Sequence, residues 1–295
     1  MSYSGWILLT ASLVGLSCGF IGVLLILRRM AMMADAISHT VLLGIVISFL
    51  ITRELSGISM LIGSIAAGLL TSVLVQWVHN RGVQQEAAIG IVFTTLFALG
   101  VVLIATKVGN AHLDVKHALM GEITFIPWET ITLPVLGAIP EAVFLLSIVL
   151  LVVVVILVLF YKEWKITAFD PALAASLGIP TALLHYVFMS LVSVTTVASF
   201  DAVGAIMVVA MLITPASAAY LWTDRLSVML LLSGAFGVLS AVLGYSVAVW
   251  LDTSISGSMA FSTGIIFGVS FLLSPKHGMI VKRVRPSMAI GKEEA

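Results

Sequence analysis

Nine stretches of this chain are each long and apolar enough to cross a lipid bilayer. A membrane-spanning segment needs about 20 mostly apolar residues, and its backbone must satisfy its own hydrogen bonds, which favours a helix. The composition agrees, because 61% of the 295 residues are hydrophobic and 9% are charged, against roughly 25% charged residues in an average soluble domain. We therefore predict an all-α, polytopic helical membrane protein with a single transmembrane domain over residues 1–295. The nine stretches lie near residues 5–27, 33–52, 56–78, 84–106, 141–161, 181–199, 201–222, 226–250 and 256–274.

The composition also excludes several classes of protein. A soluble fold could not bury this much apolar surface, which rules out a cytosolic enzyme and a disordered chain. Basic and acidic residues balance at 14 each, so net positive charge cannot drive binding to nucleic acid. A single cysteine, Cys18, excludes a disulfide framework and a cysteine-built zinc site. The motifs G-x-x-x-x-G-K-[ST] and H-E-x-x-H do not occur, so we expect neither a P-loop ATPase nor an intramembrane zinc protease.

The number of spans depends on one short junction, Ser199-Phe200-Asp201. If the two stretches beside it form one broken element, the chain has eight spans rather than nine. Asp201 and Asp252 fall at external helix ends, and Asp201 is expected to cap a helix N-terminus.

The distribution of lysine and arginine predicts the orientation, because cytoplasmic loops are enriched in both. With nine spans, one side of the membrane receives eleven basic residues and the other receives three. We therefore expect the N-terminus outside and the C-terminus in the cytoplasm, with a short basic tail over residues 275–295. The eleven are Arg28, Arg29, Arg81, Lys162, Lys165, Arg225, Lys276, Lys282, Arg283, Arg285 and Lys292, and the three are Arg53, Lys107 and Lys116.

Two segments between spans are long enough to form structure of their own. In the cytoplasmic segment 162–180, Asp170 can cap a short helix with Pro171 at its first position. Gly178 can close that helix, and Pro180 prevents its continuation. The predicted product is a helix of about two turns near residues 170–178.

The other segment, 107–140, is external on this topology and contains His112, Asp114 and His117. These side chains could capture a metal ion, but no readable constraint brings them together, and their role stays open.

The second span contains an ionisable pair, Asp35 and His39. An aspartate at mid-membrane costs about 2.5–3.5 kcal/mol, so such residues are functional candidates by default. Residues four apart share one helix face, so the carboxylate and the imidazole can point at one spot. This oxygen and nitrogen pair suits a divalent ion such as Mn²⁺, Fe²⁺ or Zn²⁺. Two ligands are too few for a complete site, and a symmetric dimer would supply four. The alternative is a structural hydrogen bond between the two side chains.

Other polar or sulfur-containing residues carry weaker signals. His185 and Glu86 lie at cytoplasmic starts of spans, where an interfacial role is more common than a ligand role. Met30, Met32 and Met33 could suggest a Cu(I) pathway, but clustered methionine is more often packing material. Small residues at Gly63 and Gly68, and the motif Gly264-x-x-x-Gly268, are typical of closely packed membrane helices.

Five segments, taken in chain order, together resemble one family, the permease subunits of ATP-binding-cassette importers for manganese, zinc and iron. The nearest resemblance is to manganese-importer permeases. Two residues depart from the family pattern, since Thr40 stands where alanine is usual and Leu43 stands where a proline is expected. The missing proline affects the expected bend above His39, not the two candidate ligands. The segments are DAISHTVLLG (35–44), LDVKHALMG (113–121), FDPALAASLG (169–178), VGAIMVVAMLITPA (203–216) and LSPKHG (273–278).

The resemblance implies a function and a set of partners. Asp35 and His39 map onto the family's metal-coordinating pair, and Asp170, Pro171, Ala174 and Gly178 map onto the helix that couples to the ATPase. The chain would be a permease without enzymatic activity of its own in the plasma membrane of a bacterium. Its partners would be a second permease (an identical or related copy), a cytoplasmic ATPase dimer and an extracytoplasmic metal-binding protein. It would carry Mn²⁺ by preference, with Zn²⁺ or Fe²⁺ as alternatives, and hold no permanent cofactor.

Two readings from other classes remain. An ion-coupled secondary metal transporter would also place an acid and a histidine at mid-membrane, but it would need no ATPase; such proteins often have paired broken helices, and we find no convincing pair. A membrane enzyme that uses Asp35 and His39 as acid and base lacks an accompanying nucleophile or metal triad.

Overall fold

A computed structural model describes residues 2–52, 57–108, 123–128, 130–133 and 137–274 of the chain. Within these residues nine helices are long and apolar enough to span a membrane, as the sequence predicts. They are α1 (Tyr3–Leu27), α2 (Ala31–Thr52), α3 (Gly57–His79), α4 (Gln85–Leu103), α6 (Glu141–Leu159), α9 (Thr181–Val203), α10 (Ala205–Trp222), α11 (Leu226–Leu251) and α12 (Ile255–Leu273).

The remaining elements are short and lie at the ends of the bundle. A single π-helical turn, η1 (Ile104–Val108), continues α4. A 3-10 turn, η2 (Ile126–Trp128), precedes the antiparallel hairpin of β1 (Thr130–Leu133) and β2 (Gly137–Pro140). Two helices, α7 (Tyr161–Phe169) and α8 (Pro171–Ser176), join α6 to α9. The sequence predicts neither the pairing of β1 with β2 nor α7, but only the helix that the structure places at α8.

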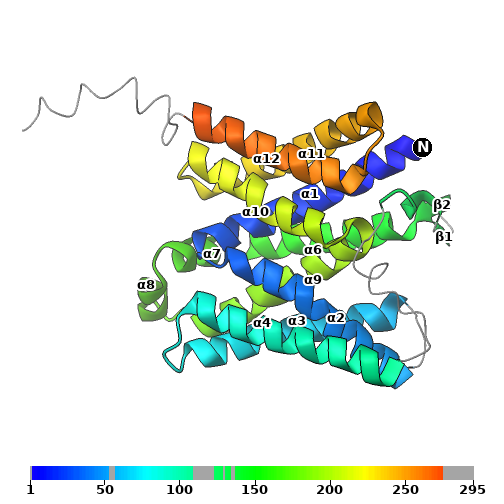
Figure 1. The fold of residues 1–295 in the computed structure, drawn as a ribbon. Coiled ribbons are helices and arrows are strands. Elements are labelled where there is room, and N and C mark those ends of the chain that lie inside the picture. The colour runs from blue at the N-terminus through cyan, green and yellow to red at the C-terminus, as the bar shows by residue number, and fades with distance from the viewer. Residues whose placement is uncertain (1, 53–56, 109–122, 129, 134–136, 275–295) are drawn as a thin grey trace, which may run out of the picture.

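The long helices form two groups that meet along α1 and α9. Helices α1, α10, α11 and α12 pack together, as do α2, α3, α4 and α9, and α6 lies against α1 and α9 (Figure 1). The hairpin and the start of α1 lie at one end of the bundle, which we call the Tyr3 end. Helices α7 and α8 lie at the other end, which we call the α8 end (Figure 1). The end of α12 also lies there, because the Ser274 hydroxyl donates a hydrogen bond to the Leu221 carbonyl.

Burial separates the central helices from the peripheral ones. In each of α1, α2 and α9, two thirds of the most apolar 18-residue window is buried, whereas only 28% of that window is buried in α6. Yet α6 is the most hydrophobic span, with a mean hydropathy of 3.6. An exposed helix rich in valine and leucine is stable only against lipid, so α6 marks a lipid-facing side of the bundle.

Glycines allow the closest contacts between helices. A Cβ added to Gly44 of α2 would lie 2.6 Å from the carbonyl carbon of Gly63 in α3. On α1, a Cβ added to Gly15 would lie 2.8 Å from the carbonyl carbon of Gly237 in α11. The expected packing role of Gly63 is therefore confirmed. The same expectation for Gly264 is wrong within the described chain, because nothing lies within 4 Å of a Cβ added there.

The short junction between the sixth and seventh spans is a single residue. Gly204 has φ +83° and ψ 161°, a conformation that residues with a Cβ rarely adopt. The chain can therefore reverse direction there, so that α9 continues to Val203 and α10 begins at Ala205. Nine spans result rather than eight. The expectation that Asp201 caps the next helix is wrong, because Asp201 lies in the last turn of α9 and Gly204 takes the cap position.

We expect Gly44→Ala to destabilise the protein by about 1–3 kcal/mol, because the new methyl group overlaps the backbone of α3. Thermal unfolding of the purified chain in detergent measures the effect. Gly264→Ala is the matched control, since the added methyl group meets open space. Similar losses in the two variants would contradict the packing described here.

Candidate functional site

Asp35 and His39 share one face of α2, in the half of the helix nearer the α8 end. They are the fifth and ninth residues of α2, and a rise of about 1.5 Å per residue places His39 about 12 Å along the helix. Atom Nε2 of His39 lies 3.6 Å from Oδ1 of Asp35. This separation exceeds the length of a normal hydrogen bond, about 2.7–3.2 Å. The two side chains thus converge on one place, at ion-pair distance but without a hydrogen bond between them.

Two phenylalanines of α4 hold the imidazole from the side. The ring of His39 stacks on Phe93 with a centroid distance of 5.7 Å and an interplanar angle of 25°. Phe97, one turn further along α4, meets the same ring edge-on, also at 5.7 Å. Their spacing of four residues places both rings on one side of α4. Neither phenylalanine is among the predicted site residues, although their i,i+4 spacing in the fourth span is visible in the sequence.

The pair is not enclosed by the part of the chain that the structure describes. The side chain of His39 is 42% exposed and that of Asp35 is 39% exposed, although α2 is among the most buried spans. A carboxylate at this depth cannot face hydrocarbon without a large free-energy cost. This face of α2 must therefore be covered by another protein surface or by a water-filled path.

The chemistry of the pair suits a divalent cation. Two ligand atoms that each lie about 2.1 Å from one ion are about 3–3.5 Å apart at octahedral or tetrahedral angles. The observed separation of 3.6 Å is within a few tenths of an ångström of this range. Among the described residues no group of three or more His, Cys, Asp or Glu side chains lies close enough to hold a metal ion. Further ligands would have to come from elsewhere.

At the α8 end, the predicted cap of the short helix is present. Asp170 accepts a hydrogen bond of 2.9 Å from the Leu173 amide, and Pro171 is the first residue of α8. Gly178 has φ +78°, and it follows the helix in the position that glycine usually occupies. The side chain of Ala174 is fully buried against the rest of the chain. The short helix is therefore fixed at both ends and along one side.

The opposite side of the α7–α8 corner presents an apolar surface. Phe169, Leu173 and Leu177 are each half or more exposed, although this end of the bundle also carries the charged side chains of α7. An exposed apolar patch rimmed by polar residues is typical of a surface that binds another protein.

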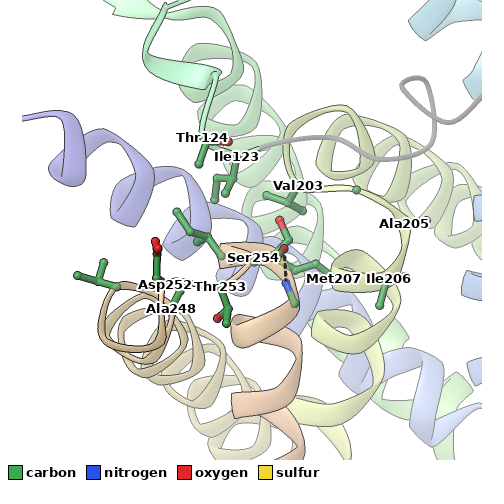
Figure 2. A pocket seen from close by; sticks show the side chains of 15 residues that line it. Ile123, Thr124, Val203, Ala205, Ile206, Met207, Ala248, Asp252, Thr253 and Ser254 are labelled. Atoms are coloured by element: carbon green, nitrogen blue, oxygen red, sulfur yellow. Dashed lines mark hydrogen bonds between the residues drawn. The ribbon is translucent and has the colours of Figure 1, made fainter. Parts of the chain in front are cut away.

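A separate cavity of about 600 Å³ opens at the Tyr3 end. Figure 2 shows three segments around it, namely residues 123–124, the α9–α10 junction and the turn between α11 and α12. In that turn Asp252 has φ +51° and ends α11, and Ser254 accepts a hydrogen bond from the Gly257 amide at the start of α12. No residue of α2 lines this cavity, so it is distinct from the Asp35–His39 pair.

Among the residues that the structure describes, no other predicted His, Asp or Glu joins the pair as a possible metal ligand. His112, Asp114 and His117 lie outside the described residues. Met30 and Met33 are buried in the core, as expected for packing residues, whereas Met32 is exposed. Glu86 is exposed in the first turn of α4. His185 lines a small cavity at the α8 end.

Comparisons with known proteins agree on one family. Residues 2–274 match the profile of the ABC 3 transport family. The chain is 56% identical to "Manganese transport system membrane protein MntD" of Bacillus subtilis over the full length of both chains. It is 40% identical to "Zinc transport system membrane protein TroD" of Treponema pallidum, over 93% of this chain and 75% of that protein. Among solved structures, "PsaBC from Streptococcus pneumoniae in complex with Fab" matches with a TM-score of 0.79 and 31% identity, covering 96% of this chain and 95% of the other.

Removing the cap at Asp170 is expected to loosen α8. Loss of an N-cap typically costs about 1 kcal/mol, so hydrogen exchange at the Leu173 amide is expected to quicken about five-fold in Asp170→Ala. Hydrogen–deuterium exchange with mass spectrometry measures this change. Asp170→Asn retains a capping oxygen and is expected to stay close to the wild type. Equal acceleration in both variants would argue against the capping bond.

Proposed function

This chain belongs to the ABC 3 transport family, and from that premise we propose that it is the membrane permease of an ATP-driven importer of divalent metal ions, with Mn²⁺ as the preferred substrate. Manganese is preferred in this proposal because the relative that is 56% identical over its full length is named as a manganese transport protein. A zinc transport protein is 40% identical, and zinc or iron is therefore the alternative substrate within the same family.

The observation that carries the proposal is the half-exposed pair of Asp35 and His39. On this proposal both side chains bind the metal ion on its way through the membrane. The gap of 3.6 Å between them favours a shared ligand over a direct hydrogen bond. Phe93 and Phe97 restrict the rotation of the imidazole, so the ring is held ready to bind without reorganisation.

A second permease subunit would complete the site. Two ligands from one chain leave most coordination positions of Mn²⁺ or Zn²⁺ empty. A two-fold partner, whether identical or related, would bring a second acid and a second histidine to the same place, and it would cover the exposed face of α2. In this arrangement the metal ion is substrate rather than resident cofactor, so its site must open to each side in turn.

A separate ATPase would supply the energy through α8. The exposed apolar side chains of Phe169, Leu173 and Leu177 suit a groove on a partner protein. The buried Ala174 and the cap at Asp170 keep the helix rigid. A displacement of α8 by the ATPase would therefore be transmitted to α7 and α9. On this proposal the α8 end faces the cytoplasm and the Tyr3 end faces outside, where a metal-binding protein would deliver the ion. The membrane is then the plasma membrane of a bacterium.

Loss of either candidate ligand is expected to reduce metal uptake. In cells with the complete importer, Asp35→Ala and His39→Ala are each expected to lower the uptake of radiolabelled Mn²⁺ at least about ten-fold. Zinc serves as competitor, and immunoblotting of membrane fractions checks insertion. Glu86→Gln and His79→Gln are matched controls, because both residues lie outside the pair. Unchanged uptake in the first two variants would remove the metal role of the pair.

A negative charge on the exposed side of α8 is expected to prevent the permease from binding the ATPase. Leu173→Glu adds a carboxylate to a half-exposed position, so the chain is expected to fold normally while losing co-purification with the ATPase and most metal uptake. Gln84→Glu adds the same charge at an exposed turn of the α8 end and is the control. Uptake that persists without the ATPase, but stops when the proton gradient is dissipated, would contradict the proposal and favour an ion-coupled transporter.

A further inference from the structure

A second cluster of polar side chains surrounds a cavity of about 340 Å³ at the α8 end. The cavity lies between the end of α1, the corner of α7 and α8, and the first turns of α9. Its polar lining consists of Arg28, Arg29, Thr167, Thr181 and His185. None of these residues belongs to the candidate metal pair or to the exposed side of α8.

Arg28 is held rigidly in this cluster. Its guanidinium lies 5.2 Å from the ring centroid of Trp164 and 4.9 Å from that of Phe188. One terminal nitrogen donates a hydrogen bond of 2.9 Å to the Thr167 hydroxyl, while the same hydroxyl donates to the Glu163 carbonyl. The guanidinium therefore joins α1 to α7 and α9 in a fixed orientation.

The positive charge of Arg28 is not neutralised by the described part of the chain. Its Nε is buried and has no acceptor, and no carboxylate of the described residues lies within ion-pair distance of it. Burial lowers the pKa of Arg28 to about 10, so the side chain is still protonated at neutral pH. Cation–π contacts compensate part of the cost of burial, but a largely buried guanidinium that no described carboxylate neutralises favours an anionic partner.

Arg29 provides an independent observation. It has φ +57°, and the amides of Arg29 and Met30 bond to the carbonyls of Ile26 and Leu25. This is the helix-ending motif in which glycine normally occupies the left-handed position. An arginine there carries a backbone strain that glycine would avoid. The feature that arginine adds is a second positive charge on a residue that lines the cavity.

We propose that this cavity binds a phosphate group through the guanidinium groups of Arg28 and Arg29, with Thr181 and His185 as further hydrogen-bond partners. Paired guanidinium groups match the geometry of phosphate oxygens. The site directly follows the last residue of a membrane span, the depth at which phospholipid headgroups lie. The phosphate could thus come from an anionic lipid or from free inorganic phosphate. Either source would tie the α7–α8 corner to α1 and α9. The proposal goes beyond metal import and does not depend on it.

The test measures thermal unfolding of the full-length chain in two arms. In detergent, inorganic phosphate is titrated against chloride at constant ionic strength. In lipid nanodiscs, phosphatidylcholine alone is compared with a mixture containing phosphatidylglycerol. A rise in melting temperature in the first arm indicates free phosphate as the ligand, and a rise in the second indicates the lipid headgroup. Both results support the proposal, because ligands that bind only the folded state stabilise it.

Variants separate the site from general charge effects. Arg29→Gly removes the guanidinium while suiting the left-handed backbone, so it is expected to fold without loss of stability and to weaken apparent affinity about ten-fold or more. Arg28→Lys keeps the positive charge but loses the planar guanidinium and its paired N–H donors, and it is expected to weaken phosphate binding as well. Arg81→Gln is the control, because Arg81 also packs on a tryptophan, Trp77, but lines no part of this cavity. No stabilisation of the wild type in either arm, or equal stabilisation of Arg29→Gly and wild type, would overturn the proposal.

Discussion

The hydrocarbon interior of a membrane offers no hydrogen-bond partner, and the structure of this chain follows from that constraint. Every described span is a helix because a helix satisfies its own backbone. Many serine and threonine hydroxyls inside the spans bond to carbonyls one turn earlier, as Ser17 does with Leu13 and Ser147 with Val143. Under this constraint an exposed Asp35 and His39 are exceptional. Their cost is acceptable only if something polar, such as water, a metal ion or a partner subunit, occupies the place where they converge.

Close packing of α2 sets where that pair can lie. Gly44 and Gly63 bring the backbones of α2 and α3 together, and the Thr40 hydroxyl accepts a hydrogen bond from Thr71 of α3. Thr40 stands where alanine is usual in the family that the sequence resembles, and this hydrogen bond gives the threonine a structural role. With one side of α2 bound to α3, the side that carries Asp35 and His39 is left beside α4, where Phe93 and Phe97 meet the imidazole.

The α8 end connects this pair to the surface on which an ATPase is proposed to act. Arg28 ends α1, bonds to Thr167 of α7 and packs against Phe188 of α9. Seven residues later on the same chain, Asp35 begins the candidate metal site, separated from Arg28 only by a tight turn and the first residues of α2. Because α8 packs against α7, these contacts link α8 to the turn that leads into α2 and the candidate pair. A phosphate bound beside Arg28 would stiffen this link.

Much of this description is determined by the sequence alone. The nine apolar stretches, the shared face of Asp35 and His39, and the cap formed by Asp170 and Pro171 depend on hydropathy, helical periodicity and local hydrogen bonds, all of which act over a few residues. The sequence could not reveal that Gly204 rather than Asp201 takes the cap position between the sixth and seventh spans, that α7 precedes α8, or that β1 pairs with β2. Nor could it reveal that Phe93 contacts His39 or that Arg28 lies between Trp164 and Phe188. These contacts join residues more than 50 positions apart, and only the packing of whole helices against one another decides which side chains meet.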